Sequence, residues 1–278
     1  MTYNILAFLT QPLTGMWVDR IKHKHWILLT SILSLTMAVL VASFVMAAGA
    51  SLSGMAVVAV LLGVGNSLFH VWGGKLVAVQ TENDIRALGV FVATGAFGLS
   101  IGMLFFSWPL LYAFLLSICL LSMLCLNLDT DFHHTTTHTT VEKRKFSTLF
   151  VSLAIIALMA AVLLRSFVGE AFTGGISKDK AMILLIGMVC MLGKMAGGWI
   201  AKWMGIVRSL VLILALLLCS FLFKDRSIIL LMTGLFAVNC TMPITLYLAN
   251  VVLPKREGLA FGLLAAALIP GYLIALCL

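Results

Sequence analysis

The sequence predicts an all-α, multi-pass membrane protein. Hydrophobic residues make up 62% of the 278 residues and charged residues only 10%, whereas a soluble domain carries about 25% charged residues. Apolar runs recur along the whole chain, and about 20 helical residues suffice to cross the hydrocarbon layer of a bilayer. The runs are continuous and do not alternate with period two, which excludes barrel strands.

Charged and turn residues divide the chain into ten apolar segments, each of which we expect to be a helix. The first segment is short, at ~24 Å for a rise of 1.5 Å per residue, and the charged stretch GMWVDRIKHKHW (15–26) ends it as a hinge at the membrane face. The expected segments are 3–18, 26–48, 54–79, 87–106, 108–128, 147–169, 180–203, 206–223, 227–250 and 258–278.

Positive charge predicts which loops face the cytoplasm, because cytoplasmic loops carry an excess of Lys and Arg. The loops after the odd-numbered segments hold the larger set: Arg20, Lys22, Lys24, Arg86, Lys143, Arg144, Lys145, Lys202, Arg208, Lys255 and Arg256. The opposite loops hold Arg165, Lys178, Lys180, Lys224 and Arg226. This scattered pattern is typical of membrane orientation and not of a nucleic-acid-binding face, so no nucleic acid is expected as a partner.

The longest connection predicts two halves: an N-terminal bundle (1–128), a cytoplasmic linker (129–146) and a C-terminal bundle (147–278). The linker is rich in Thr and contains His133, His134 and His138. A His-rich tract can bind metal, but the setting without Cys favours a flexible tether. All six cysteines fall in apolar runs with no metal-site spacing, so they are interpreted as small packing residues. We expect no metal and no cofactor.

The two halves show matched positions. An offset of 183 pairs Gly15 with Gly198 and places Gln11 over Lys194. An offset of 173 superposes Asn66 on Asn239, Gly89 on Gly262 and Gly98 on Gly271. Parallel internal repeats of this kind build one large class of secondary transporters.

Several motifs resemble the major facilitator superfamily. GMWVDRIKHK is similar to the loop signature between the second and third of the twelve helices in that family, and Gly198, Lys202 and Arg208 resemble its second-half copy, with Lys202 in place of Asp. LLGVGNSLFHVWGG (61–74) and VLLRSFVG (162–169) are similar to the fourth and seventh helices of fosmidomycin-resistance-type exporters. Gly95, Gly98 and Gly102 resemble the fifth helix of that group, where they are expected to serve helix packing, although Met103 replaces the usual Pro.

The resemblance implies a two-bundle fold with a truncated twelve-helix pattern. The ten segments would correspond to family helices 2–6 and 7–11, so helices 1 and 12 are missing, as in a truncated gene model or fragment. It also implies a secondary active transporter that moves a small, drug-like molecule by alternating access and proton-coupled efflux, as an antiporter in the inner membrane of a bacterium. The potential cations within the spans (Lys75, Arg165, Lys194 and His70) and the few carboxylates there would suit an anionic or polar substrate. The alternative is a membrane sensor or scaffold that no longer transports.

Enzyme activity is not predicted. The stretch GLSIG (98–102) matches a nucleophile pattern by letter, but it lies within an apolar helix and not in a strand–turn–helix elbow. The chain also lacks a HExxH motif and a phosphate-binding Gly-Lys-Ser/Thr loop.

A cytoplasmic gate is implied by the family motif. Asp19 is expected to pair with basic groups and helix ends and so to hold one conformational state closed. Arg20 and Lys202 belong to the same motif and its copy, while Gly15 and Gly198 would allow close helix contact. The other interpretation is a loop whose charges face water and only set the topology.

Polar residues within the spans are candidates for substrate or ion coupling, because a polar stripe facing lipid would be costly. Asn66 and His70 are four residues apart and share a helix face. His70 would bind substrate or relay a proton, since histidine titrates near pH ~6.5, or it would form a hydrogen bond between helices. Gln11, Arg165, Lys194 and Asn239 complete the candidates, whereas Lys75 is interpreted as snorkelling to the interface.

Overall fold

The structure is a computed structural model that describes residues 2–21, 25–105, 107–126, 147–174, 179–223 and 227–277. The expected linker with His133, His134 and His138 lies outside the described residues. Its interpretation as a tether therefore stays a prediction.

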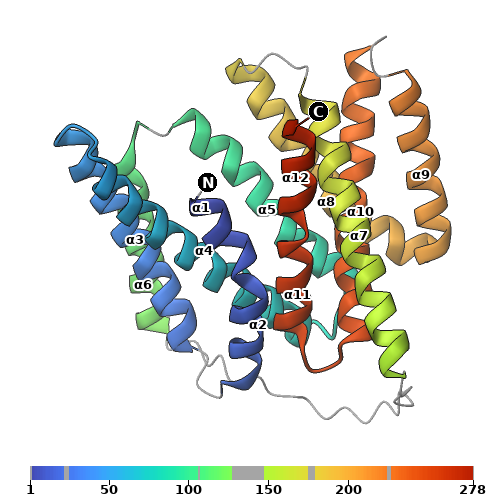
Figure 1. Ribbon diagram of the computed structural model, residues 1–278, viewed down its shortest axis with the longest axis horizontal. Coiled ribbons are helices and arrows are strands. Elements are labelled where there is room, and N and C mark those ends of the chain that lie inside the picture. Colours follow the sequence, from blue (N-terminus) through green and yellow to red (C-terminus); the bar gives the residue numbers. More distant parts are fainter. Residues whose placement is uncertain are drawn as a thin grey trace. The chain divides into compact units, whose positions relative to one another are not determined.

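Each of the ten expected segments is confirmed as helical, and no strand occurs among the described residues. Figure 1 shows the helices in chain order. Eight segments are single helices: α3 (His25–Ala47), α4 (Leu52–Gln80), α5 (Ile85–Leu104), α6 (Pro109–Leu126), α7 (Thr148–Thr173), α8 (Lys180–Met204), α9 (Ile206–Leu222) and α10 (Ile228–Val252).

The first and last segments are divided. The first comprises α1 (Thr2–Asn4), the π-helix η1 (Ile5–Leu9) and α2 (Gln11–Arg20), and the last comprises α11 (Glu257–Ala266) and α12 (Leu268–Cys277). Proline explains both divisions, because it has no N–H and its ring clashes with the carbonyl four residues earlier. Pro12 stands four residues after Phe8 in η1, and Pro270 stands four residues after Ala266, where α11 ends.

Side-chain caps fix the starts of α7, α8 and α10 close to the expected ones. The side chains of Ser147, Asp179 and Ser227 accept hydrogen bonds from backbone N–H groups in the first turns of α7, α8 and α10. At the other end of α8, Gly205 has a φ of +82° and joins α8 to α9 without a longer loop.

Seven stretches of the described chain are long and apolar enough to cross a membrane. They are Trp26–Ala47, Leu52–Gln80, Ile85–Leu104, Thr148–Thr173, Lys180–Met204, Ile228–Val252 and Glu257–Ala275. The chain is thus an integral, multi-pass membrane protein. The three remaining segments are helical but have shorter apolar stretches among the described residues: Leu111–Leu121 in α6, the 17 residues of α9, and the first segment, which η1 interrupts.

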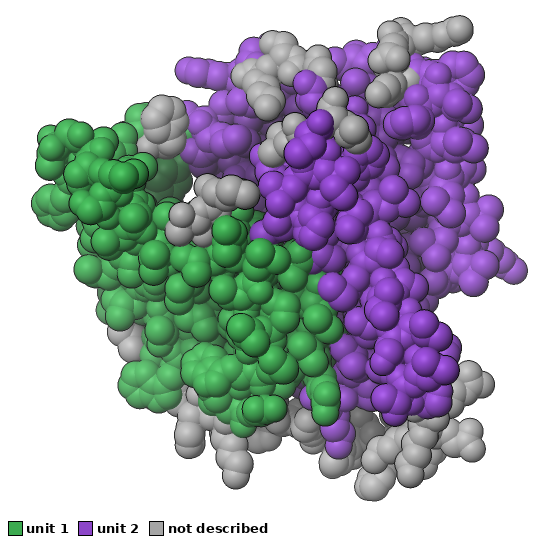
Figure 2. Space-filling model, viewed as in Figure 1, with its two compact units in different colours: residues 1–76, 105–132, 256–266 green, residues 77–104, 133–255, 267–278 purple. Residues whose placement is uncertain are grey.

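Two compact units make up the chain, and Figure 2 shows them in different colours. Unit 1 contains residues 1–76, 105–132 and 256–266; within it α2 packs against α11, and α3 against α6. Unit 2 contains residues 77–104, 133–255 and 267–278; within it α5 packs against α8, and α10 against α7, α8 and α9. Each unit combines segments from both sides of the expected linker, and the division into bundles 1–128 and 147–278 stays a prediction.

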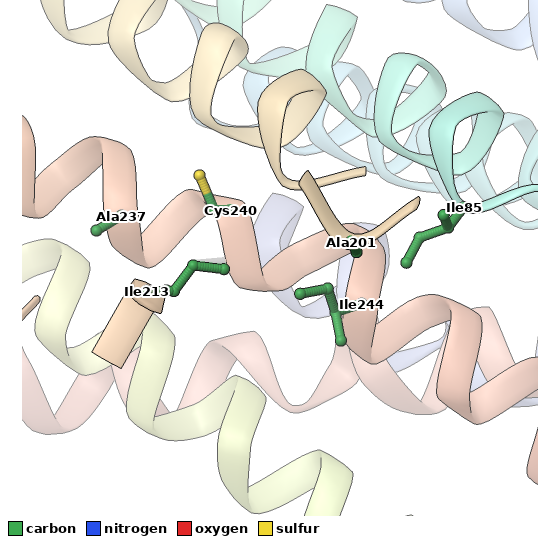
Figure 3. Close-up of a cluster of buried hydrophobic side chains, with 6 residues drawn as sticks. All are labelled: Ile85, Ala201, Ile213, Ala237, Cys240 and Ile244. Carbon is green, nitrogen blue, oxygen red and sulfur yellow. The ribbon is translucent and has the colours of Figure 1, made fainter. Parts of the chain in front are cut away.

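The hydrophobic core of unit 2 is built around α10. Figure 3 shows the buried side chains of this cluster, which come from α5, α8, α9 and α10: Ile85, Ala201, Ile213, Ala237, Cys240 and Ile244. The three members from α10 are spaced by three and four residues, so they share one face of the helix. Cys240 is 1% exposed, which confirms its interpretation as a small packing residue. Cys119, Cys219 and Cys277 are instead exposed and free.

Candidate functional site

Asp19, in the last turn of α2, caps the beginning of α11. Its carboxylate accepts hydrogen bonds from the backbone N–H of Gly258 at 3.1 Å and of Leu259 at 2.9 Å. The first N–H groups of a helix have no partner within it and carry partial positive charge. A carboxylate supplied by another helix satisfies both demands, so Asp19 connects two segments about 240 residues apart in the chain.

Lys75 of α4 completes this arrangement. Its Nζ lies 2.8 Å from Asp19 Oδ1 and 3.5 Å from the carbonyl oxygen of Val18. The side chains of Lys75 and Asp19 are only 7% and 8% exposed. The interpretation that Lys75 snorkels to the interface was therefore wrong, because the ammonium ion is held inward by the carboxylate. We call Asp19, Lys75 and the first turn of α11 the α2–α11 lock.

Glycine brings the two helices of the lock together. A Cβ added at Gly15 would overlap the backbone of Gly258, and a Cβ at Gly258 would lie 3.0 Å from the carbonyl oxygen of Gly15. The absence of side chains lets the backbones of α2 and α11 approach closely. Because Asp19 stands one turn after Gly15, this approach carries its carboxylate to the start of α11. Arg20, the neighbouring motif residue, is exposed.

An equivalent arrangement joins α8 to α5 in unit 2. A Cβ at Gly198 would lie 2.6 Å from the carbonyl oxygen of Ile85, the first residue of α5. One turn after Gly198, Lys202 Nζ lies 3.9 Å from Oδ2 of Asp84, the residue before α5. Asp84 also binds Arg86, with 2.6 Å between Oδ2 and the guanidinium. We call Asp84, Arg86, Lys202 and this helix crossing the α5–α8 lock.

Electrostatics keep Asp84 ionised. The hydrogen bond from the Arg86 side chain, helped by the positive charge of Lys202, lowers the pKa of Asp84 to about 2. Arg86 is in turn placed over the ring of Trp199, with its guanidinium carbon 5.2 Å from the ring centroid. Sequence reasoning placed Lys202 in the motif copy but missed its acidic partner. The signal was present in the sequence, since Asp84 precedes the apolar run of α5 and is followed two residues later by Arg.

The two locks obey the offsets found in the sequence. Gly15 and Gly198 differ by 183, and their contacts at Gly258 and Ile85 differ by 173. A second pair of contacts repeats the relation: a Cβ at Gly262 would overlap the carbonyl of Gln11, and a Cβ at Gly89 would lie 2.8 Å from the carbonyl oxygen of Lys194. Positions that match along the chain thus make matching contacts, which supports the internal repeat.

The acidic residue comes from opposite partners of the helix crossing in the two copies of the repeat. In the α2–α11 lock the acid is Asp19 on α2, and in the α5–α8 lock the acid is Asp84, just before α5. Lys75 has no charged equivalent, because an offset of 173 leads to Leu248, which packs against the hydrophobic cluster. An acid–base pair at the crossing is retained in both copies, although the residues that supply it differ.

The described candidates of unit 1 lie on α2 and α4. Gln11 is fully buried, and its Nε2 donates to the carbonyl of Ala7 at 2.6 Å. His70 and Asn66 are half-buried, and the His70 ring lies 6.4 Å from that of Phe261 on α11. Sequence reasoning missed Ser67, whose hydroxyl lies 3.1 Å from that of Thr10 and 3.0 Å from that of Thr14.

The described candidates of unit 2 form one polar group. Lys194 of α8 lies within electrostatic range of both Arg165 of α7 and Cys190 of α8. Asn239 of α10 donates from Nδ2 to the carbonyl of Leu235 at 2.8 Å and to Cys190 Sγ at 3.4 Å. Arg165, Lys194 and Asn239, chosen separately from the sequence, are therefore gathered in one region of unit 2.

Gly98 and Gly102 make no close helix contact among the described residues. A Cβ at either residue would meet no described atom within 4 Å, and Gly95 is exposed. The face of α5 that packs carries Gly89 and Ser100; Ser100 contacts Gly187 of α8. Gly98 and Gly102 each stand two residues from Ser100, about 200° around a helix of 3.6 residues per turn. These two glycines therefore lie on the side of α5 away from its contact with α8, and their role in helix packing stays a prediction.

A metal site is not formed by the described residues, among which no group of three His, Cys, Asp or Glu side chains is gathered.

The model of the Major Facilitator Superfamily matches residues 1–276. The chain belongs to this superfamily. No curated protein matches it in sequence.

Among solved structures, the chain is similar to the human organic anion transporter MFSD10 (TETRAN). The TM-score is 0.67 at 18% sequence identity, and the match covers 98% of this chain and 75% of that one. At this identity the likeness shows the fold. Membership in the superfamily makes the chain a membrane transporter of all-helical fold, whose partners are the lipid bilayer and a small-molecule substrate.

Proposed function

We propose that the chain is a secondary active transporter that works by alternating access, and the α2–α11 lock is the observation that carries the proposal. Asp19 and Lys75 form an ion pair with little exposure to water, at a point where α2 and α11 approach closely through Gly15 and Gly258. A partly desolvated pair that exists in one conformational state biases the equilibrium toward that state. Such a contact suits helices that separate and return during a transport cycle.

The α5–α8 lock supports the same function against the alternative of a sensor or scaffold. That alternative draws on Lys202, which replaces the acid of the first copy. Asp84 restores the acid–base pair at this crossing from the opposite helix. Because Lys202 still has an acidic partner at this crossing, the α5–α8 lock favours a functional gate over a sensor or scaffold that has lost transport.

The transported substrate is proposed to leave the cell in exchange for protons, across the inner membrane of a bacterium. His70 supports the coupling, because it is half-buried within a span and histidine changes charge near neutral pH. In this proposal the loops between α4 and α5 and between α10 and α11 face the cytoplasm. The local similarity of 61–74 to fosmidomycin-resistance-type exporters also belongs to this proposal.

Flux through proteoliposomes tests the proposal. The purified chain should move a small solute such as fluorescently detected norfloxacin or radiolabelled succinate faster when an imposed pH gradient is present. His70→Ala should remove the acceleration by the gradient, while Lys180→Gln, a change at an exposed position at the start of α8, should keep it. Flux that equals protein-free vesicles for all solutes tried, with the protein folded and inserted, would favour the sensor or scaffold instead.

A further inference from the structure

Two basic side chains of unit 2 have no anionic partner among the described residues. Arg165 of α7 and Lys194 of α8 are half-buried and lie within electrostatic range of each other. Neither forms an ion pair with a described acidic side chain, and Glu170, five residues after Arg165 on the same helix, forms none with it. Two like charges that approach in a medium of low dielectric constant repel each other strongly. The repulsion between Arg165 and Lys194 therefore makes an unfavourable contribution to the free energy of the fold.

Arg165 carries a second cost. Its Nη1 is buried and has no hydrogen-bond acceptor among the described residues. A guanidinium group has five N–H donors, and leaving a buried donor of a charged group without an acceptor is energetically costly. Charged residues in membrane spans normally pair with one another or with backbone carbonyls. Arg165 instead has a buried N–H donor without an acceptor among the described residues.

Lys194 lies on a protein-facing stripe of α8. Gly187 and Gly198, at seven residues before and four after Lys194, both meet α5, and these spacings return to one face of a helix. The backbone of Lys194 itself contacts Gly89 of α5. This placement argues against simple snorkelling toward a lipid headgroup, and it directs the lysine among helices.

The surrounding polar groups are uncharged. Asn239 of α10 contacts α8 through Gly193 and Cys190, and α10 packs against both α7 and α8. Pro243 lies four residues after Asn239 and has no N–H, so the backbone carbonyl of Asn239 loses its usual helical partner. The group of two cations and one amide is rich in donors.

We propose that Arg165, Lys194 and Asn239 bind a small water-soluble organic anion with two negative charges, such as a dicarboxylate or a phosphate monoester. Two negative charges offset two cations whose repulsion is otherwise uncompensated, and a planar carboxylate or phosphate group matches the fork of the guanidinium. The lysine acts as a point charge for the second negative group. The inference rests on the proposed function, since it names the class of substrate that the transporter would carry.

Binding to the purified full chain in a neutral detergent tests the inference. The unfolding midpoint, followed by tryptophan fluorescence, should rise with succinate and with glycerol 3-phosphate, less with acetate, and not with glycerol. Arg165→Gln and Lys194→Gln should each weaken binding of the dianions at least tenfold. Arg165→Gln should also bring the affinity for succinate close to that for acetate, which a merely structural role would not do.

Matched controls separate the site from general charge effects. Arg208→Gln removes an exposed basic side chain of α9 and should leave dianion binding unchanged. Arg165→Lys keeps the charge without the fork and should give an intermediate affinity, which covers the case in which Arg165→Gln fails to fold. Dianion binding that is equal in the wild type, Lys194→Gln and Arg165→Lys would overturn the inference. Binding of phosphatidic acid, but not of soluble dianions, through the same residues would overturn it as well.

The binding experiment needs no membrane gradient, so its failure is distinct from failure of transport. If dianions bind through Arg165 and Lys194 but no flux occurs, the site stands and the proposed transport function fails. If pH-driven flux occurs but neither substitution changes dianion binding, the transport function stands and this assignment of the site fails.

Discussion

Asp19 shows how one side chain can join three helices. Its carboxylate binds Lys75 of α4 and two N–H groups at the start of α11, while its backbone belongs to α2. Removing one partner of a buried ion pair costs about 3–5 kcal/mol, because the other charge is left buried without compensation. The remaining partner, not the lost bond, dominates the effect.

This argument predicts the result of a double-mutant cycle. Asp19→Asn should lower the unfolding midpoint in detergent strongly, and the additional change Lys75→Met should recover most of the loss, since no isolated charge remains. Arg20→Gln, at the exposed neighbouring position, should change the unfolding free energy by no more than about 0.5 kcal/mol. If the effects of Asp19→Asn and Lys75→Met simply add, the two side chains do not form the pair that the structure shows.

The contact of Asp84 predicts that stability depends on pH in the acidic range, below the range in which a histidine would titrate. The pKa of Asp84 is lowered to about 2 by Arg86 and Lys202, below the ordinary value of about 3.9. A lowered pKa means that the contact stabilises the fold above the ordinary pKa and that this contribution is lost as the pH falls toward about 2. The difference in unfolding midpoint between the wild type and Asp84→Asn should therefore be constant from pH 8 to pH 5. Below pH 4 this difference should shrink toward zero. A difference that closes between pH 7 and pH 5 would contradict the lowered pKa.

At the scale of helices, glycine position decides which crossings are tight. A Cβ at Gly198 would lie 2.6 Å from a backbone oxygen, which cannot move away as a flexible side chain can. Gly98 has open space where its Cβ would be. The same substitution should therefore have opposite effects at the two sites.

Gly198→Ala should destabilise the protein by about 1–3 kcal/mol, the usual cost of overpacking. Gly98→Ala should be neutral or stabilising by up to about 1 kcal/mol, because alanine favours helix over glycine. Unfolding midpoints of the two variants in the same detergent provide the comparison. A loss of stability for Gly98→Ala equal to that for Gly198→Ala would show that a partner packs against that face of α5.

The helices could be predicted because each depends on its own apolar run, and a bilayer leaves such a run few alternatives to a helix. Pro12 alone predicts an interruption of the first helix. It does not predict that the interruption takes the form of a π-helix. The pair of Lys75 with Asp19 could not be derived from local pattern, because 56 residues separate the partners. Snorkelling is the better local explanation for a lysine near a helix end, and only tertiary contact overrides it.

The candidate site divides in the same way. The offset of 183 placed Gln11 over Lys194, and both residues carry a carbonyl that a glycine of another helix contacts. That agreement was predictable because a repeat conserves backbone geometry between its own copies. The gathering of Arg165 with Lys194 was not predictable, because it depends on how α7 and α8 pack around α10.

At the scale of the whole molecule, the orientation in the membrane remains a prediction from charge, and it can be tested without knowledge of the substrate. Ser51 lies between α3 and α4, Gln80 is the last residue of α4, and both are exposed. They lie at opposite ends of a helix of 29 residues, a length of about 43 Å at 1.5 Å per residue, which exceeds the hydrocarbon thickness. One of the two must therefore face each side of the membrane.

The excess of Lys and Arg in the loops after the odd-numbered segments places Gln80 in the cytoplasm and Ser51 outside. In a background with the native cysteines replaced, Ser51→Cys should react with a membrane-impermeant maleimide added to intact cells, and Gln80→Cys should react only after the cells are permeabilised. Reaction of both variants in permeabilised cells controls for access to the thiol. The reverse pattern would place both locks on the outer side, and the proposed gate would then close the opposite face of the transporter.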